Sequence, residues 1–321
     1  KARREDNEAE IVLFEKGENI SYAGCGLPYY ISEVIDSRDQ VVINTPEKFS
    51  KKYGVEVRTG HEVTDILTEK KKLKYKILDQ NKVEEYDFDK LIMATGASPI
   101  TPPIPGIKLD NILSFRRLKD ADKVKDRIEK QDLNNITIVG AGLVGLEMAE
   151  AFSELDLEVT VIEKLPRVLP QISREMAEIV ESHLKEQDVN LILNDGVSKF
   201  MGDNRVREVY TEKNHSIASD LVLVSVGVKP NVELAEKAGI KIGETGAIAV
   251  NKRMETSHPD IYAAGDCAES KNLITGQPAW LPLGSTANKQ GRVAGENAAG
   301  GDNEHNGILK TAITKIFDLA V

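Results

Sequence analysis

Gly140-Ala141-Gly142-Leu143-Val144-Gly145 is a glycine-rich hexapeptide near the middle of this 321-residue sequence. It follows the apolar run NITIV at residues 135–139, which predicts a β-strand, and it precedes residues 146–155, whose apolar spacing predicts a helix. A GxGxxG turn between a strand and a helix is typical of a dinucleotide-binding βαβ unit. The first glycine permits the tight turn, the second lets a pyrophosphate approach the backbone, and the third lets helix and strand pack closely.

An acidic residue follows this turn at the distance that such a unit requires. Glu163 ends the apolar run EVTVIE and lies 23 positions after Gly140, near the ~20 typical of an acid that binds the adenosine ribose hydroxyls. This acid favours NADH, whereas Lys164 and Arg167 leave NADPH possible because they can bind a 2′-phosphate. We predict NAD(P)H binding by a set of residues around the turn: Gly140, Gly142, Val144, Gly145 and Glu163.

The strand that ends in an acid occurs twice in the chain. Residues 10–16 read EIVLFEK, and residues 158–164 read EVTVIEK, 148 positions later. The repetition predicts a second dinucleotide-binding unit, with Glu15 and Lys16 at its cofactor. By the same offset, the glycine turn of that unit would precede Lys1. Because the chain also opens on Lys rather than Met, we expect an N-terminal truncation.

Bulk composition limits the classes of function. With a formal net charge of −10 and a pI near 5.2, the chain lacks the basic surface that general nucleic-acid binding requires. No apolar stretch approaches the ~18 residues of a membrane span and no apolar leader opens the sequence, so we expect a cytoplasmic protein with no membrane partner. Two cysteines are too few for a disulfide scaffold. The five histidines show no metal-ligand spacing, so no metal site is predicted.

Four further motifs surround the glycine turn. One is the decapeptide SYAGCGLPYY at residues 21–30, which contains Cys25. The others read ATGASP at 94–99, SVGVKPN at 225–231 and IYAAGD at 261–266. Together with the glycine turn, these motifs resemble the single-cysteine branch of the pyridine nucleotide-disulfide oxidoreductases, which includes coenzyme A-disulfide reductases and NADH oxidase-like proteins. The resemblance extends over nearly the whole chain.

The resemblance implies an α/β fold with two Rossmann-like dinucleotide-binding domains, one for FAD and one for NAD(P). The NAD(P) domain would be inserted in the FAD domain, and terminal parts would be missing. Prolines at 99–105 and Pro230 mark the expected boundaries. The expected domains are 1–104 (first part of the FAD-binding domain), 105–227 (NAD(P)H-binding domain) and 228–321 (second part of the FAD-binding domain). The interface domain of the family implies a homodimer in the intact protein.

The resemblance also gives cofactor and substrate roles to single residues. Asp266 would hold the ribityl chain of FAD, and Ala287 would approach the flavin ring. Glu147, which follows the glycine turn, would lie beside the nicotinamide. The other cofactor candidates are Val63, through its backbone at the adenine, Thr95 and Gly96 along FAD, Ala264 and Gly227. The substrate candidates, which align with family positions that contact coenzyme A, are Lys1, Arg4 and Ser21.

Cys25 is the candidate redox centre. It precedes a helix that we expect to begin near Leu27-Pro28, and the N-terminus of a helix favours the thiolate, which is the reactive form. Tyr30 occupies the position where two-cysteine relatives carry a second sulfur, so no internal disulfide can form there. Cys25 would therefore cycle through a mixed disulfide, a persulfide or a sulfenic acid. Cys267 is expected to have a packing role.

Three functions remain open from the sequence. The favoured one is an FAD-dependent NAD(P)H:disulfide oxidoreductase that reduces coenzyme A disulfide, persulfide or polysulfide through Cys25. The second is an NADH oxidase or peroxidase in which Cys25 cycles as a sulfenic acid. The third is an inactive nucleotide-binding fragment or an NADH sensor. Gly24 replaces the asparagine common in coenzyme A reducers, and Tyr22 replaces the more usual phenylalanine, so the acceptor remains open.

Overall fold

The chain is built as two units, each assembled from segments far apart in the sequence. The computed structural model describes all residues from 1 to 321. The first unit comprises Lys1–Ser21, Asn44–Ser98 and Lys229–Thr311, and the second unit comprises Tyr22–Ile43, Pro99–Val228 and Ala312–Val321. The chain passes from one unit to the other between Ser98 and Pro99 and between Val228 and Lys229, close to the expected boundaries. The segments 22–43 and 312–321, however, pack with the second unit. The assignment of the domain ranges to the two cofactors stays a prediction.

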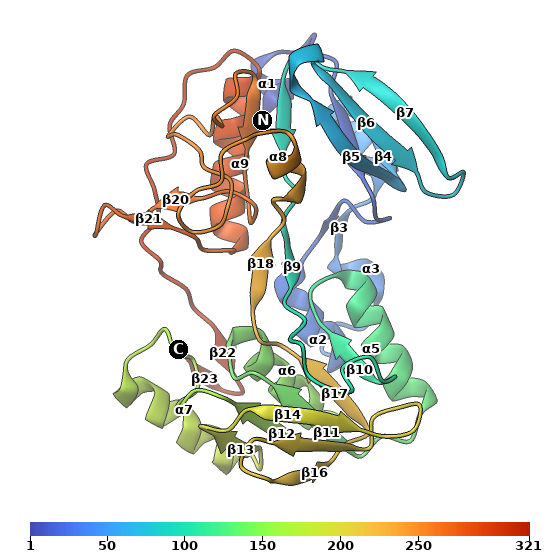
Figure 1. Cartoon of the computed structure of the whole chain (residues 1–321), viewed down its shortest axis with the longest axis vertical. Coiled ribbons are helices and arrows are strands. Elements are labelled where there is room, and N and C mark those ends of the chain that lie inside the picture. The colour runs from blue at the N-terminus through green and yellow to red at the C-terminus, as the bar shows by residue number, and fades with distance from the viewer. The chain divides into compact units, whose positions relative to one another are not determined.

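A five-stranded parallel sheet forms the centre of the second unit (Figure 1). In sheet order, its strands are β10 (Ile112–Ser114), β17 (Leu221–Val224), β11 (Asn135–Val139), β12 (Glu158–Glu163) and β13 (Asn190–Leu193). Its helices are α5 (Leu118–Lys130), α6 (Leu143–Ser153) and α7 (Arg174–Glu186). The strand order reverses at β11, because β12 and β13 lie to one side of it and β17 to the other. Ligands of such sheets bind beyond the carboxyl ends of the strands at this point.

Both faces of the parallel sheet are buried at β17, which explains the unbroken apolar run of this strand. Leu221 and Leu223 belong to the core that contains α5, α6 and α7. Val222 and Val224 belong to the core formed with a three-stranded antiparallel sheet. Successive side chains of a strand point to opposite faces, so a run without polar residues serves both cores. The antiparallel strands are β14 (Val197–Met201), β15 (Glu208–Thr211) and β16 (Ser216–Ala218).

Two short segments pack on the helices of the same unit. Residues around Cys25 form a 3-10 turn that continues into α2, and α2 packs against α5 and α6 through the buried Leu27 and Ile31. A hairpin near residue 315 lies beside α6. These elements are η1 (Gly24–Gly26), α2 (Leu27–Ile31), α3 (Arg38–Val41), β22 (Lys315–Ile316) and β23 (Leu319–Ala320).

The first unit has its own core and several small sheets (Figure 1). The parallel pairs are β1 (Val12–Glu15) with β4 (Glu56–Thr59), and β8 (Leu91–Met93) with β19 (Ile261–Ala263). The antiparallel strands are β5 (His61–Leu67), β6 (Lys72–Ile77) and β7 (Lys82–Asp87), and β20 (Ser270–Lys271) with β21 (Pro278–Ala279). The helices are α1 (Ala2–Glu5), α4 (Pro46–Tyr53), η2 (Thr68–Lys70), α8 (Glu233–Lys237) and α9 (Gly284–Ala298).

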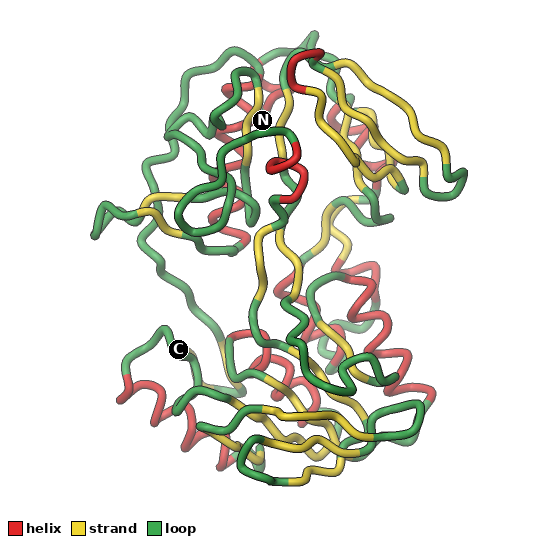
Figure 2. Tube along the Cα trace, viewed as in Figure 1, coloured by secondary structure: helices red, strands yellow, loops and turns green.

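Four strands lie where the chain crosses between the units. They are β2 (Ser21–Tyr22), β3 (Val42–Asn44), β9 (Ala97–Pro99) and β18 (Val228–Pro230). Figure 2 shows strands and helices in both units. None of the helices is long and apolar enough to cross a membrane.

The sequence predicted the strand at 135–139 correctly but misplaced the start of the next helix. The structure begins α6 at Leu143, three residues earlier than expected, so that Val144 and Gly145 lie in its first turn. Gly142 directly precedes the helix, and its carbonyl accepts the Leu146 N–H at 3.0 Å. The glycine-rich turn is therefore shorter than the hexapeptide, and half of the motif is already helical.

Candidate functional site

The three glycines of the turn differ in what surrounds them. Gly140 has a φ of +107°, which favours glycine, and a Cβ there would lie 2.4 Å from the Ser225 carbonyl oxygen. A Cβ at Gly145 would lie 2.1 Å from the Gly140 carbonyl oxygen, so this glycine lets α6 pack against the turn. A Cβ at Gly142 would meet nothing within 4 Å. The backbone at Gly142 is thus open to a ligand at the N-terminus of α6, where a pyrophosphate fits.

Glu163 lies beside this turn at the end of β12. Its Oε2 accepts the Ala141 N–H at 2.8 Å, and its Oε1 accepts the Leu165 N–H at 2.8 Å. These two hydrogen bonds fix the carboxylate next to the glycine turn. The arrangement fits a dinucleotide whose pyrophosphate lies at Gly142 and whose ribose lies at Glu163.

Gly227 belongs to a loop that borders the same turn. Ser225 donates its N–H to the Val139 carbonyl at 2.8 Å, which places this loop beside the end of β11. Gly227 has a φ of +104°, and its carbonyl accepts the Ile100 N–H at 3.0 Å. The structure therefore brings together two segments that the sequence separates by more than 80 positions.

Glu15 has the same local geometry as Glu163. Each residue ends a parallel strand, and each carboxylate accepts the backbone N–H two positions on. The Glu15 bond to Gly17 is 2.6 Å, and the Glu163 bond to Leu165 is 2.8 Å. Both copies of the repeat that the sequence predicts therefore form the same hydrogen bond, one copy in each unit. The cofactor roles of the two acids stay predictions.

Lys16 and Val63 lie near Glu15 in sequence and in the strands of the first unit. Lys16 forms an ion pair with Glu62, with Nζ and Oε1 3.7 Å apart. Val63 follows Glu62 in β5, which is an edge strand of its sheet. An edge strand leaves part of its backbone outside the ladder, as an adenine contact through the Val63 backbone requires.

Asn231 joins the motifs ATGASP and SVGVKPN. Its Nδ2 donates to the Thr95 carbonyl at 2.8 Å, and its Oδ1 accepts the Ser98 hydroxyl at 2.8 Å. Its backbone N–H donates to the Gly96 carbonyl at 2.9 Å, and its carbonyl accepts the Thr95 hydroxyl at 2.7 Å. Four hydrogen bonds therefore hold the loop whose backbone is expected to lie along FAD. A Cβ at Gly96 would meet nothing within 4 Å, so this loop is open on that side.

Gln290, which sequence reasoning missed, holds the turn that carries Asp266. Gln290 is completely buried in α9, and its Oε1 accepts the Gly265 N–H at 2.9 Å. A Cβ at Gly265 would lie 3.5 Å from the Cβ of Ala287, so the turn packs on the first turn of α9. The sequence carries no clear signal for Gln290, because α9 contains several other polar residues and only burial shows that this amide needs hydrogen-bond partners.

Cys267 is an interior thiol, and the predicted packing role is confirmed. Its side chain is completely buried, with Sγ 3.5 Å from the Met93 carbonyl and 3.4 Å from the Ala264 carbonyl. Ala264 donates its own N–H to the Met93 carbonyl at 3.0 Å, which joins β8 to the turn after β19. Burial raises the pKa of the Cys267 thiol, so the reactive thiolate is disfavoured.

Cys25 is the one exposed thiol of the chain. It lies in η1, directly before α2, and Pro28 occupies the first turn of that helix as expected. Leu27 is 1% exposed and anchors the helix while the sulfur stays accessible. Tyr30, at the position of a second sulfur in two-cysteine relatives, is buried. The Cys25 sulfur is therefore accessible from solution, and Tyr30 leaves no second sulfur at that position.

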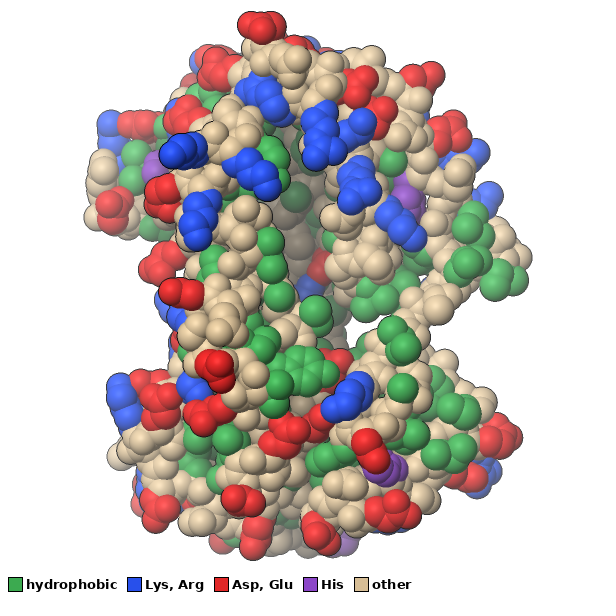
Figure 3. Space-filling model, turned by 180° about the vertical axis from the view of Figure 1, so that it is seen from behind, with side chains coloured by type: hydrophobic (Ala, Val, Ile, Leu, Met, Phe, Trp, Pro, Cys, Tyr) green, Lys and Arg blue, Asp and Glu red, His purple; other side chains and the backbone are tan.

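The basic substrate candidates share one neighbourhood. Lys1 pairs with Glu296 of α9 at 3.1 Å, and Arg4 is exposed. Helices α1 and α9 pack against each other, so Lys1 and Arg4 lie beside the same helix. Figure 3 shows Lys and Arg side chains gathered around a hollow on one face of the first unit. Ser21 lies in β2 and is half-buried.

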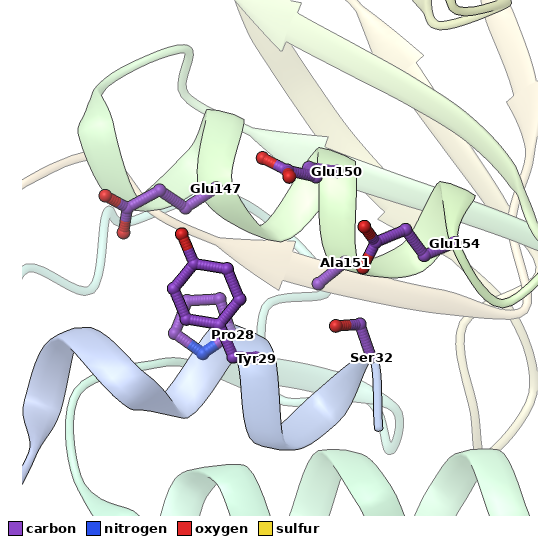
Figure 4. Close-up of a pocket in the computed structure, with 7 residues that line it drawn as sticks. All are labelled: Pro28, Tyr29, Ser32, Glu147, Glu150, Ala151 and Glu154. Carbon is purple, nitrogen blue, oxygen red and sulfur yellow. The ribbon is translucent and has the colours of Figure 1, made fainter. Parts of the chain in front are cut away.

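Glu147 faces a small cleft between α2 and α6 (Figure 4). The Tyr29 hydroxyl points toward α6 in this view. Burial raises the pKa of the Glu147 carboxyl, the hydrogen bond from Thr314 lowers it, and the charge of Glu150 raises it. The helix that follows Cys25 and the helix of the glycine turn therefore meet at the half-buried carboxyl group of Glu147. The cleft is lined by Pro28, Tyr29, Ser32, Glu147, Glu150, Ala151 and Glu154.

Comparison with known proteins gives a consistent set of relatives. Residues 1–291 match the family model described as pyridine nucleotide-disulphide oxidoreductase. An NADH oxidase of Methanocaldococcus jannaschii is 38% identical over 321 residues, which cover 99% of this chain and 71% of that protein. An NAD(P)H coenzyme A polysulfide/persulfide reductase of Pyrococcus horikoshii is 38% identical over 322 residues, which cover 100% of this chain and 71% of that protein.

A solved structure shows the same fold. The NAD-dependent persulfide reductase from A. fulgidus superposes with a TM-score of 0.96 at 40% sequence identity. The match covers 99% of this chain and 60% of that one, so the chain spans less than two thirds of the solved protein. The predicted fold class is confirmed.

Proposed function

The chain belongs to the pyridine nucleotide-disulphide oxidoreductase family, as the sequence predicted, and we propose that it acts as an FAD-dependent NAD(P)H:disulfide oxidoreductase through Cys25. The observation that carries this proposal is the exposed thiol at the start of α2, which packs against α6, the helix of the glycine turn. An exposed thiol and a glycine-rich turn at the N-terminus of a helix thereby belong to one unit, which supports the proposal. The chain spans only part of its relatives, so activity, acceptor and partner are all part of the proposal.

The proposed chemistry at Cys25 is thiol–disulfide exchange. The Cys25 thiolate attacks one sulfur of a disulfide RSSR, the S–S bond breaks, and one half leaves as a thiolate. Two electrons then cleave the new bond between Cys25 and the bound half, which restores the thiolate and releases the second thiol. When bound, FAD supplies these electrons after it accepts a hydride from NAD(P)H. In total, NAD(P)H, one proton and RSSR give NAD(P)⁺ and two RSH.

The cofactors would be held by residues of both units. The open backbone at Gly142 and the fixed carboxylate of Glu163 suit NAD(P)H, with Gly140, Val144, Gly145 and Gly227 shaping the turn. The expected FAD residues are Glu15, Lys16, Val63, Thr95, Gly96, Ala264, Asp266 and Ala287. Coenzyme A contacts are proposed for Lys1, Arg4 and Ser21. A homodimer and a cytoplasmic location complete the proposal.

An acceptor assay tests the proposal directly. In flavin-loaded full-length protein, NADH oxidation is expected to proceed faster with coenzyme A disulfide, coenzyme A persulfide or polysulfide than with oxygen. The relative of P. horikoshii, named as a coenzyme A polysulfide/persulfide reductase, supports these acceptors. A protein that reduces its flavin with NADH but passes electrons only to oxygen would instead be an oxidase, a reading supported by the name of the M. jannaschii relative. Absence of bound flavin would leave only a nucleotide-binding role.

NADH is the proposed reductant, and Glu163 provides the test. Glu163→Ala is expected to weaken NADH by about tenfold or more while NADPH is weakened less, because one hydrogen bond to a charged group is lost (~1.5–3 kcal/mol) and repulsion of a 2′-phosphate disappears. Dissociation constants for the two nucleotides measure the change.

Lys164→Ala is the matched control for Glu163. The Lys164 side chain is 72% exposed and pairs with Glu212 at 2.9 Å, so its loss should leave the fold and the NADH affinity unchanged. It should weaken only NADPH, which loses a possible partner of the 2′-phosphate. An unchanged NADH-to-NADPH ratio in Glu163→Ala would contradict the ribose assignment.

A further inference from the structure

The hairpin at residues 314–321 is docked on α6 through a buried carboxylate. Thr314 and Val321 exchange two backbone hydrogen bonds, of 3.0 and 2.9 Å, which close the hairpin. Glu150 of α6 is 5% exposed, and its two oxygens accept from Lys315 Nζ at 3.0 Å and from the Phe317 N–H at 2.7 Å. A charge-assisted pair of contacts to one buried carboxylate makes Glu150 the anchor of the hairpin.

A second contact of the hairpin lies on α7. His183 Nε2 and Asp318 Oδ1 are 2.9 Å apart, and the rings of His183 and Phe317 meet edge to face with centroids 6.1 Å apart. The hairpin is therefore held at two helices without any contribution from the Thr314 side chain. Removing the hydroxyl of Thr314 should leave the docking intact.

The Thr314 hydroxyl is directed at a different carboxylate. Its Oγ1 donates to Glu147 Oε1 at 2.8 Å, and Thr314 is 7% exposed, so this bond is shielded from solvent. Glu147 lies one helical turn before Glu150, with no cation paired to it, since Lys315 is engaged by Glu150. Burial raises the Glu147 pKa, the Thr314 hydrogen bond lowers it, and the Glu150 charge raises it. Of these three effects, only the Thr314 hydrogen bond favours the anion.

The remaining groups around Glu147 are neutral or negative. Tyr29 of α2 points its hydroxyl toward it, and Ser32, Glu150 and Glu154 also line the cleft (Figure 4). The Thr314 hydroxyl therefore provides the hydrogen bond that orients the Glu147 carboxyl group in this cleft.

We infer that Thr314 is a positioning residue, whose hydroxyl holds the Glu147 carboxyl group in one orientation, toward the nicotinamide ring. This inference rests on the proposed function and on the place beside the nicotinamide that the family resemblance gives to Glu147. The oxidised ring carries a positive charge and the reduced ring is neutral, so an anion beside it favours the oxidised form. Thr314 would thereby bias the site toward hydride donation by NADH.

Equilibrium binding tests this inference without turnover. The ligands are NAD⁺, which has a cationic ring, and 1,4,5,6-tetrahydro-NADH, which has a neutral ring and donates no hydride. Both are titrated calorimetrically into full-length protein with oxidised FAD. Thr314→Val is expected to weaken NAD⁺ by about tenfold, the scale of one hydrogen bond to a charged group, and tetrahydro-NADH by less than about twofold. Thr314→Ser keeps the hydroxyl and should restore the NAD⁺ affinity.

The pH dependence has a defined sign. Loss of the Thr314 hydroxyl raises the Glu147 pKa further. As the pH falls, Glu147 should therefore become neutral, and the preference for NAD⁺ should disappear, at a higher pH in Thr314→Val than in the unsubstituted protein. The preference should return as the pH rises. Glu147→Gln should abolish the preference at every pH. Equal weakening of both ligands in Thr314→Val, or no weakening, would overturn the role of Thr314.

The outcomes distinguish a failure of this inference from a failure of the proposed function. If Glu147→Gln changes the NAD⁺ preference but neither Thr314→Val nor Thr314→Ala does, Thr314 has no positioning role and the placement of Glu147 stands. If Glu147→Gln also has no effect, both the placement and the inference are wrong. Failure of NADH to reduce the flavin of the unsubstituted protein would refute the proposed function itself.

Discussion

Cys25→Ser is expected to leave the reduction of FAD by NADH nearly unchanged and to reduce turnover with disulfide or polysulfide acceptors to background. A serine hydroxyl neither attacks a disulfide nor accepts electrons, so only the second half-reaction is lost. The change is conservative in size, and Cys25 is exposed, so the packing of α2 through Leu27 and Ile31 should persist. Slow oxidation of reduced flavin by oxygen should be the only remaining turnover.

Stopped-flow absorbance under anaerobic conditions resolves the two half-reactions. Cys267→Ala is the matched control, because Cys267 is buried beside the Met93 and Ala264 carbonyls and should affect stability but not acceptor reduction. Undiminished reduction of coenzyme A disulfide or polysulfide by Cys25→Ser would show that another group is the redox centre. Equal loss of both half-reactions would indicate a damaged fold instead.

The parts of the fold that follow local rules were predictable from the sequence. β17 is apolar on both faces, and β11 is apolar except at Asn135 and Thr137; such runs indicate buried parallel strands. The start of α6 was not predictable in this way. Glycine is a poor helix former, so its propensity predicts that Gly145 belongs to a turn. Its place in the helix depends on close packing against Gly140, which local propensity does not report.

Long-range contacts account for what the sequence did not reveal. Nothing near Leu27 indicates that α2 packs on α5 and α6, whose residues lie about 100 positions later, so the segment 22–43 was expected to stay with the first domain. The hydrogen bond from Thr314 to Glu147 spans 167 positions. No feature of the sequence around Thr314 indicates this contact, because the contact depends on a hairpin that Glu150 holds in place.

The candidate site was more predictable than these contacts. Glu163 and Glu15 were found from a repeated seven-residue pattern, and both carboxylates indeed bind the backbone at equivalent positions. The pattern succeeds because each acid lies at the end of its strand, where one local hydrogen bond fixes it. Gln290 and Asn231 act across the fold, and their partners become visible only in three dimensions.

Gly142→Ala and Gly145→Ala are expected to have opposite effects on stability and nucleotide binding. Gly142 has a φ of −82°, which suits alanine, and a Cβ there meets no protein atom within 4 Å. The free energy of unfolding should therefore stay unchanged, while NADH affinity falls by about tenfold or more because the methyl group takes the space where the pyrophosphate approaches the backbone. At Gly145, a Cβ would lie 2.1 Å from the Gly140 carbonyl oxygen. That clash should cost about 1–3 kcal/mol of unfolding free energy or more.

Urea unfolding and NADH titration of the two variants separate the roles of the two glycines. Gly145→Ala should lose stability first and NADH affinity only as a consequence, because α6 must move away from the turn before the nucleotide site changes. Gly142→Ala should keep the stability of the unsubstituted protein and still bind NADH poorly, which only a ligand in contact with the Gly142 backbone explains. If Gly142→Ala binds NADH with unchanged affinity, the nucleotide does not approach the backbone at this turn. The assignment of the second unit to NAD(P)H would then be wrong, however well the turn resembles a dinucleotide-binding motif.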